Sequence, residues 1–235
     1  MYGYSTSMFL INSFVYSSAP SWSNTKSILT DGVDDYVDCG TLGSLSGTSF
    51  TVSAWAKANT SGVNDAIVST RINGLGSSRG FDLYLVDGAG TLYARVYNGA
   101  GLFAQISTTI SLATWYNFVL VYSSGTAELF VNGVSVGTGA VTYADSASTF
   151  SIGRHRTSGF FDGNIDEVAV WNSDQSANVS TIYNSGTPQD LASLTPQNYW
   201  RCGDGDTFPT LTDNAGSNNG TMTNMTSGDI VADVP

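Results

Sequence analysis

Residues 115–137, WYNFVLVYSSGTAELFVNGVSVG, constrain the fold more than any other stretch because they predict three short strands joined by two tight turns. Apolar residues occupy both faces of the first strand, so we expect it to be central and covered on both sides. Small residues ending at Gly125 form the first reversal, and Asn132-Gly133 is the dipeptide best suited to a two-residue turn at positive φ. The pattern predicts an antiparallel meander in the middle of a β-sandwich.

Alternating apolar residues predict further strands on both sides of the meander. These strands cover residues 27–30, 36–39, 50–57, 66–72, 80–86, 91–97, 150–153, 164–171 and 198–202. In NIDEVAVW (164–171) strict alternation puts Asp166 and Glu167 on opposite faces. A single helix is predicted over 176–184, with Gly186 as its stop signal. One short helix among many strands predicts an all-β fold.

The charge balance argues against one class of partner. The chain has 19 acidic and 8 basic residues and a net charge of −11, whereas binding to a nucleic-acid backbone needs a basic field. No stretch reaches the roughly eighteen apolar residues of a membrane span, so no membrane partner is expected. Many aspartates lie in Gly- and Asn-rich turns, where they either stabilise the turn or bind Ca²⁺. Cys39 and Cys202 either pair or remain buried free thiols.

Length and patterning predict one β domain with two flanking segments. At 235 residues a single sandwich is of ordinary size. Residues 1–26 form an N-terminal arm, rich in Tyr and Ser, that is either folded back or docked on a partner. Its apolar run lacks a preceding positive residue, which makes it a poor signal peptide. Residues 27–186 form the sandwich, and we expect residues 187–235 to complete it.

An ordered set of motifs resembles a known family. SILTDGVDDYVDCG, LSGTSFTVSAWAK, the meander, SIGR, FDGNIDEVAVWN and the helix ending in YNSG follow one another over residues 27–186. In this order they are similar to the laminin-G-like branch of the concanavalin A-like jelly rolls. The resemblance implies an all-β, jelly-roll β-sandwich with one short helix.

The C-terminal segment resembles a piece that precedes the first matched strand in many members of this family. That piece is NYWRCGDGDTFPTLTDNAGSNNGTMTN, residues 198–224. The resemblance therefore implies a circular permutation, which is physically cheap because the termini of a sandwich lie at its surface. The segment either closes the same sandwich or completes a neighbouring copy by strand exchange.

The resemblance also implies a calcium site, because the family commonly holds Ca²⁺ between a DxxGxxNG loop and the acidic residues of the IDEV strand. The matching positions here are Asp213, Gly216, Asn218, Asn219, Asp166 and Glu167. A glycine-rich loop lets backbone carbonyls converge on such an ion together with carboxylates and amides. The alternative is an Asx turn held by hydrogen bonds without a metal. Asp31, Asp34 and Asp35 are the second choice for the site.

Carbohydrate binding is common among jelly-roll sandwiches and needs exposed aromatic faces flanked by amide and carboxylate groups. The candidate residues for such a surface are Phe160, Phe161, Asp162, Arg154, Arg156, Tyr97 and Asn98. Alternatively, Phe160 belongs to the core and the arginines pair with the acidic surface.

No catalytic site is expected. Glycosidases on related sandwiches need two carboxylates at a defined separation, but Glu128 and Glu167 are the only glutamates and lie on separate predicted strands. His155, the only histidine, has no accompanying GxSxG motif and is predicted to lie at the surface or in a loop.

These features favour a non-enzymatic structural and adhesive protein. The motif order, the opening NTKSILTDGVDDYVDCG and the ending GDIVADVP are similar to small structural proteins of bacteriophage particles. We therefore expect a virion protein, either a capsid decoration or a fibre subunit of head or tail, that contacts capsid or other virion proteins. We also expect it to form a homo-oligomer and to adhere to host-surface glycans. The alternative is a secreted, lectin-like carbohydrate-binding module.

Overall fold

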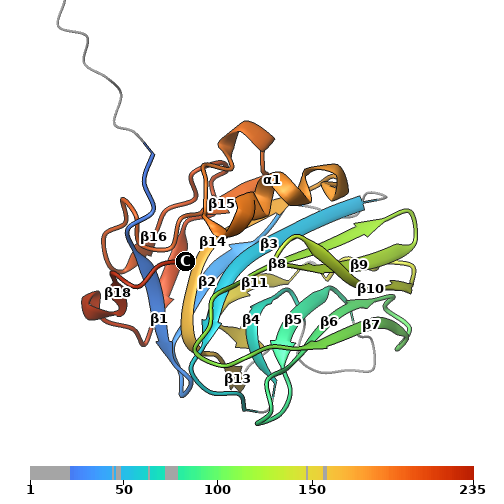
Figure 1. The fold of residues 1–235 in the computed structure, drawn as a ribbon, viewed down its shortest axis with the longest axis horizontal. Helices are drawn as coiled ribbons and strands as arrows, with labels where there is room; N and C mark the ends of the chain where they lie inside the picture. Colours follow the sequence, from blue (N-terminus) through green and yellow to red (C-terminus); the bar gives the residue numbers. More distant parts are fainter. Residues whose placement is uncertain are drawn as a thin grey trace, which may run out of the picture.

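Two large antiparallel sheets pack face to face in the computed structural model (Figure 1). The structure describes residues 22–43, 45, 49–62, 64–71, 79–146, 148–155 and 158–235. Most of the predicted N-terminal arm lies outside the described residues. The architecture confirms the all-β sandwich predicted from the sequence.

We call the sheet that contains the meander sheet A. Its strands run in the order β10-β9-β8-β3-β14-β1-β18, and β15 pairs with β14. Their bounds are β1 (Ser27–Asp31), β3 (Ser49–Ala58), β8 (Tyr116–Ser123), β9 (Thr126–Val131), β10 (Val134–Ala140), β14 (Asp162–Trp171), β15 (Asn198–Trp200) and β18 (Ile230–Val231). The predicted meander is β8-β9-β10, and Asn132 and Gly133 have the expected positive φ values of 50° and 77°.

We call the second sheet sheet B, and its strands run in the order β16-β17-β2-β11-β4-β5-β6-β7. Their bounds are β2 (Tyr36–Thr41), β4 (Asp65–Ser69), β5 (Phe81–Leu85), β6 (Thr91–Tyr97), β7 (Phe103–Thr109), β11 (Thr149–Ile152), β16 (Thr210–Leu211) and β17 (Gly220–Thr223). A separate hairpin of β12 (Arg154–His155) and β13 (Ser158–Phe160) packs against β4.

The single short α-helix confirms the predicted helical segment. It is α1 (Val179–Tyr183), and the 3-10 turns η1 (Ser176–Asn178) and η2 (Asn184–Gly186) flank it. Two further 3-10 turns are η3 (Ala192–Leu194) and η4 (Ser227–Asp229). Within the described residues, no helix combines the length and the apolarity that crossing a membrane would require.

The main hydrophobic core lies between the two sheets, and a smaller one lies on the other side of sheet A. Phe118 and Leu120 of β8 point into the main core. Val119 and Val121 of the same strand pack with Ile182 of α1 in the smaller core. Strand β8 is therefore covered on both faces, as its sequence predicts.

The strict alternation predicted for β14 is wrong at one point. Its register against β3 shifts after Asp166, and Glu167 has a φ of 46°. This β-bulge re-aims the side chains that follow it. Ile165 and Val168 consequently both join the main core, and the two acidic residues enter one polar network.

Besides β16, which has only two residues, two strands of sheet B were not predicted. β7 reads FAQISTT and buries only Ala104 and Ile106 well, because its remaining side chains are partly or fully exposed at a sheet edge. β17 reads GTMT and is too short to show a clear period. Both strands are fixed by their pairing partners, which a single-strand pattern cannot reveal.

The C-terminal segment contributes strands to both sheets of its own chain. β15 pairs with β14, β17 pairs with β2, and β18 pairs with β1. Figure 1 shows the red end of the chain beside the blue strand β1. Trp200 is fully buried and stacks on Phe150 with ring centres 5.3 Å apart. The circular permutation itself stays a prediction.

The two cysteines are both buried free thiols. Cys39 lies on β2, and Cys202 follows β15. The structure therefore has no disulfide between Cys39 and Cys202.

Gly220 lets β17 pack against β2, and a side chain there has no room. A Cβ at this position would lie 2.5 Å from Val37 Cγ1 and 3.2 Å from Cys39 Sγ. We expect Gly220→Ala to lower the free energy of unfolding by about 1–3 kcal/mol through overpacking. Thr221→Ser, at an exposed position of the same strand, is the control and should change it by less than about 0.5 kcal/mol. Chemical denaturation measures both, and equal stability of Gly220→Ala and the wild type would contradict this packing.

Candidate functional site

Sheet B has one face turned away from the main core, which we call the outer face of sheet B. From β17 to β7, each strand contributes one residue to a continuous row that crosses the sheet, because these residues are paired with one another from strand to strand. The row is polar throughout: Thr221, Asp38, Ser151, Ser69, Asp82, Arg95 and Gln105. The adjacent row in the same register is apolar and belongs to the main core: Met222, Val37, Ile152, Val68, Leu83, Ala94 and Ile106. Since successive side chains of a strand point to opposite faces, the polar row faces outward.

Asp82 is the buried centre of this row. Its Oδ1 accepts a hydrogen bond from Ser69 Oγ at 2.6 Å. Its Oδ2 lies 3.6 Å from His155 Nε2 and 3.7 Å from Arg71 Nη1, and it has no hydrogen-bond partner among the described residues. A buried polar atom without a partner is uncommon and calls for an explanation such as a ligand or an ordered water.

Tyr84 lies beside Asp82 and presents a second buried polar atom of this kind. The Tyr84 ring stacks on the His155 ring with centres 5.2 Å apart, and its hydroxyl has no hydrogen-bond partner among the described residues. Burial raises the pKa of the Tyr84 hydroxyl to about 12, so it remains a hydrogen-bond donor at neutral pH. The expectation that His155 lies at the surface is wrong, because β12 places it in this cluster, where it is only 5% exposed.

Aromatic rings surround the cationic end of the row on β5, β6 and β7. The Arg95 guanidinium carbon lies 5.2 Å from the ring centres of Tyr84 and Tyr93 and 4.7 Å from that of Phe103. Arg95 Nε donates a hydrogen bond to Gln105 Oε1 at 2.7 Å. Phe103 is 44% exposed, so part of this surface is open to solvent.

The opposite end of the row opens into a shallow hollow between β2 and β17. Its volume is about 560 Å³, and its lining consists of Asp38, Cys39, Gly40, Ser217, Asn218, Asn219, Thr221 and Thr223. Tyr36 pairs with Thr223 next to it. The Arg154 guanidinium carbon lies 3.6 Å from the centre of the Tyr36 ring, and the Phe160 ring lies 6.3 Å away. This end therefore combines hydroxyl, amide and carboxylate groups with an aromatic face.

Three of the residues predicted for a carbohydrate surface lie on or beside the outer face of sheet B. Arg154 and Phe160 meet at Tyr36, at one end of the face. Tyr97 lies toward the other end, with the Arg71 guanidinium 4.3 Å from its ring centre. They do not form one patch, because several strands separate them.

The other predicted carbohydrate residues lie elsewhere. Phe161 is fully buried in the main core. Asn98 closes a turn by accepting hydrogen bonds from the N–H groups of Ala100 and Leu102. Asp162 accepts a hydrogen bond from Thr60 Oγ1 at 2.7 Å, and Arg156 lies outside the described residues.

Sequence reasoning missed most of the polar row, although part of its signal was present. The alternation in 91–97 already sets Tyr93 and Arg95 opposite the apolar residues of the same strand. Their neighbours Asp82 and Ser69 come from two other strands, and only the pairing register brings them alongside. The alternation within a single strand therefore cannot predict such a row.

The predicted calcium residues do not form one ligand set. Asp213 Oδ1 accepts hydrogen bonds from the N–H groups of Tyr199, Ala215 and Gly216, and its Oδ2 accepts from Asn198 Nδ2 and the Asn218 N–H. Burial alone would raise the pKa of Asp213, but these hydrogen bonds outweigh it and lower the pKa. Both oxygens therefore accept hydrogen bonds from the protein's own donors, in the geometry of an Asx turn. Calcium binding at these residues stays a prediction.

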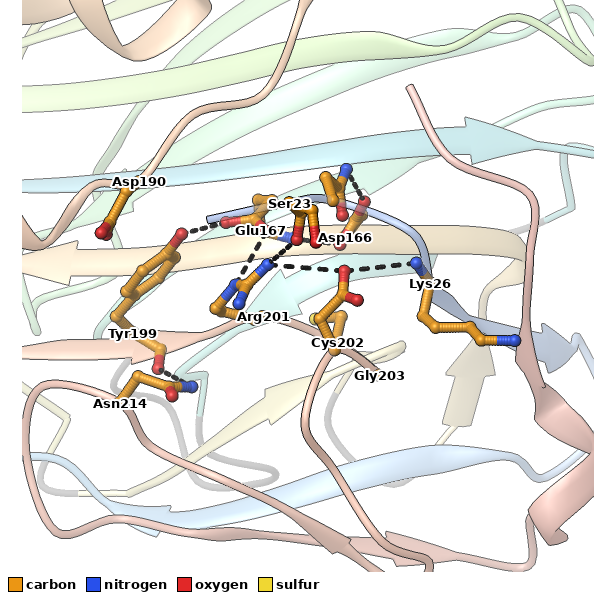
Figure 2. A network of polar contacts seen from close by, with 12 residues as sticks. Ser23, Lys26, Asp166, Glu167, Asp190, Tyr199, Arg201, Cys202, Gly203 and Asn214 are labelled. Carbon is orange, nitrogen blue, oxygen red and sulfur yellow. Dashed lines mark hydrogen bonds and ion pairs between the residues drawn. The ribbon is translucent and has the colours of Figure 1, made fainter. Parts of the chain in front are cut away.

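Asp166 and Glu167 belong to a separate, buried network (Figure 2). The Tyr199 hydroxyl donates to Glu167 Oε2, and Arg201 Nε lies 3.5 Å from Glu167 Oε1. Asn24 Nδ2 donates to Asp166 Oδ2 at 2.8 Å. These contacts join the segment before β1, the bulge of β14 and the strand β15, so the network has a structural role.

Burial shifts the protonation of both acids in this network. It raises the pKa of Glu167 to about 7, although the Tyr199 hydroxyl and Arg201 favour the ionised form. Burial and the neighbouring Glu167 carboxyl raise the pKa of Asp166 well above its usual range. Arg201 therefore faces Glu167, an acid that resists ionisation.

The second choice for a calcium site does come together in the fold. The carboxylate oxygens of Asp31, Asp34 and Asp35 all lie within 4.8 Å of one another. Asp31 Oδ1 accepts hydrogen bonds from the N–H groups of Val33, Asp34 and Asp35 and so closes the turn after β1. Burial raises the pKa of Asp35 to about 6, and the charges of Asp31 and Asp229 add to this effect. A cation at this turn stays a prediction.

Known proteins share this architecture. Residues 31–179 match the family model described as the concanavalin A-like lectin/glucanases superfamily. A candidate carbohydrate binding protein from Bacteroides ovatus has a TM-score of 0.63 at 19% identity, over 87% of this chain and 60% of that chain. The Ruminococcus gnavus IT-sialidase CBM40 has a TM-score of 0.54 at 15% identity, over 67% of this chain and 96% of that chain.

A native heptameric SAP-like pentraxin from Limulus polyphemus is also similar, with a TM-score of 0.51 at 21% identity over 68% of this chain and 82% of that chain. At such identities the likeness establishes the fold alone. This chain spans only 60% of the length of the Bacteroides ovatus protein. No curated protein matches the chain.

Asp213 provides a direct test of whether the loop needs a metal. We expect Asp213→Asn to lower the free energy of unfolding by about 2–4 kcal/mol, because the amide keeps one acceptor oxygen but places an NH2 donor where Oδ2 accepts from Asn198 Nδ2 and the Asn218 N–H. The loss should be the same in calcium and in a chelator, since the donors are the protein's own N–H groups. Denaturation in both buffers measures this, and a chelator that destabilises the wild type as strongly as the substitution would contradict it.

The buried acids predict a stability that falls as the pH rises. Glu167 holds its proton in the folded state up to a pKa of about 7, whereas it ionises near pH 4.3 when unfolded. The unfolded state therefore binds fewer protons between these values, and stability should drop on the order of 1–3 kcal/mol from pH 5 to pH 8. Glu167→Gln should reduce this dependence on pH, and Glu128→Gln, at a partly exposed position of β9, should keep it. Urea unfolding at several pH values measures the free energy of unfolding of each variant. If Glu167→Gln loses as much stability between pH 5 and pH 8 as the wild type, Glu167 is not the group responsible.

Proposed function

The chain belongs to the concanavalin A-like lectin/glucanase superfamily, and from this membership and the outer face of sheet B we propose that it is a non-enzymatic glycan-binding β-sandwich. The observation that carries the proposal is the polar row flanked by aromatic rings, with Asp82 Oδ2 and Tyr84 Oη buried without hydrogen-bond partners among the described residues. The membership also confirms the resemblance to concanavalin A-like jelly rolls.

The chemistry of the outer face suits a sugar. A sugar hydroxyl both donates and accepts hydrogen bonds, so it can satisfy the acceptor Asp82 and the donor Tyr84 together. The apolar C–H face of a pyranose packs on an aromatic ring, and Tyr93 and Tyr36 present rings at the two ends of the row. A few placed polar groups among aromatic side chains are typical of small-molecule sites.

Two similar structures support a glycan as the ligand class. A domain of an extracellular arabinanase from Geobacillus stearothermophilus is in complex with arabinotriose, and the Ruminococcus gnavus CBM40 is bound to α2,3 sialyllactose. Both have TM-scores just above 0.5. These ligands are properties of those proteins, and here they support only the general class.

A binding role fits the carboxylates better than hydrolysis does. Asp38 and Asp82 lie in the same row but three strand spacings apart, roughly 14 Å at about 4.8 Å per strand. A glycosidase pair needs about 5–9.5 Å. Glu128 is partly exposed on β9 and accepts a hydrogen bond from Ser135 Oγ, and Glu167 is buried and accepts one from the Tyr199 hydroxyl. We therefore propose binding without turnover.

The location expected from the sequence is the surface of a virion, where the chain would attach to host glycans. That location, the contacts with capsid or other virion proteins and the oligomeric state stay predictions, and detection of the chain in purified phage particles would test them. The alternative remains a secreted or extracellular lectin-like module, which shares the same glycan-binding face.

Tyr93 offers a test of the face itself. It is partly exposed beside Arg95, so Tyr93→Ala should remove an aromatic platform and weaken glycan binding by roughly tenfold, which corresponds to about 1.4 kcal/mol. Val134→Ala, at an exposed position of β10 in sheet A, is the control and should bind as the wild type does. A glycan array followed by titration calorimetry provides the measurement. Equal loss in both variants, or none in Tyr93→Ala, would refute the outer face of sheet B as the site.

A further inference from the structure

Three arginines and the histidine of this acidic chain lie on or against one face. The sequence has only 8 lysines and arginines against 19 acidic residues. Arg95 belongs to the polar row on the outer face of sheet B, and Arg71 and His155 lie against Asp82 in that row. Arg154 Nη2 donates a hydrogen bond to Ser151 Oγ of the same row at 3.3 Å. An acidic protein thus carries a local band of positive groups.

Two of these arginines are held by aromatic rings and not by carboxylates. Within the described residues, the ion pairs involve Lys57, Arg71, His155 and Arg201, and none involves Arg95 or Arg154. Arg95 lies against three aromatic rings, and Arg154 lies over the Tyr36 ring. A ring face positions a guanidinium without neutralising its charge. Both charges are therefore left for an anion from outside.

Arg154 also carries a donor that the protein leaves unused. Its Nε is buried and has no hydrogen-bond partner among the described residues. Leaving a buried charged donor unpaired is unfavourable, so such a group gains from an acceptor supplied by a ligand. A carboxylate or a sulfate ester provides the planar or clustered oxygens that a guanidinium binds best.

The spacing of the two arginines indicates a ligand with more than one anionic group. Ser151, where Arg154 is anchored, and Arg95 are three strand spacings apart in the row, roughly 14 Å at about 4.8 Å per strand. Asp82 lies between them, paired with Arg71 and His155, and leaves the two outer arginines as the unneutralised charges. The aromatic rings beside each arginine provide platforms for the sugar rings that would carry the anions.

We propose that the outer face of sheet B selects an anionic glycan chain, with Arg95 and Arg154 each binding a carboxylate or sulfate group of the chain. This specificity rests on the proposed glycan-binding function and narrows its ligand class. The excess negative charge elsewhere on the molecule repels such a chain and so favours its approach to this one band.

The test uses the full chain and two matched pairs of probes. One pair is an oligogalacturonate and its methyl-esterified form, and the other is a heparin oligosaccharide and its desulfated form. The desulfated heparin keeps its carboxylates and lacks only the sulfate esters. We expect titration calorimetry at low salt to give at least tenfold tighter binding to the more highly charged member of one pair, with an affinity that falls as salt rises. Whichever pair shows the preference identifies the anion as a carboxylate or a sulfate ester.

Variants assign the effect to the two arginines. Arg95→Gln and Arg154→Gln should each weaken binding of the preferred charged probe by about tenfold and leave the affinity for the methyl-esterified oligogalacturonate, which is neutral, unchanged. Lys26→Gln removes one positive charge away from this face and should bind as the wild type does. Circular dichroism and thermal melts establish that each variant is folded.

The outcomes separate this inference from the proposed function. Binding of neutral glycans that Tyr93→Ala weakens, without preference for the charged probe, would overturn the anionic specificity and leave the proposed function standing. Equal affinity of the arginine variants and the wild type for the charged probe would also overturn it. Absence of binding to every probe and to a broad glycan array would overturn both.

Discussion

The pairing register of sheet B is the constraint on which the rest of the structure depends. Because side chains alternate between faces, a shift of one residue in any strand would exchange the polar row with the apolar row beside it. Val37, Val68 and Leu83 hold the register by filling the core, and Asp38, Ser69 and Asp82 face outward as a result. The register that buries the apolar row in the core therefore also places the residues of the candidate site on the outer face of sheet B.

The acidic residues divide into two groups with different roles. Inside the molecule, Asp213 and Glu167 tie loops and strands of the C-terminal segment to sheet A through backbone N–H groups, Tyr199 and Arg201. Asp82 instead lies on sheet B, where its Oδ2 is near Arg71 and His155 but has no hydrogen-bond partner among the described residues. This contrast supports the proposal that the outer face of sheet B binds the ligand, and it gives Asp213 and Glu167 hydrogen-bonding roles within the protein. The aromatic rings then position arginines there without cancelling their charge.

Much of the fold could be predicted from the sequence, because the meander and the strands around it show a period of two residues. The prediction failed where a strand lacked that signal, as in β7 and β17, or broke it, as at the bulge of Glu167. The candidate site was harder to predict. Asp82 and Arg95 are thirteen residues apart in sequence and become neighbours only through the pairing of β5 with β6. His155 carried no sequence signal of burial, since its place depends on the β12–β13 hairpin packing against β4.

A crystal structure of the full chain with a bound oligosaccharide would test the central claim most directly, because it reports where the sugar lies independently of affinity. If the proposed site is right, the sugar rings lie on the outer face of sheet B and stack on Tyr36 or Tyr93. Ligand oxygens then lie within hydrogen-bond distance of Asp82 Oδ2 and Tyr84 Oη. A sugar bound on sheet A or at the turn of Asp31, with the outer face of sheet B in contact only with solvent, would contradict it.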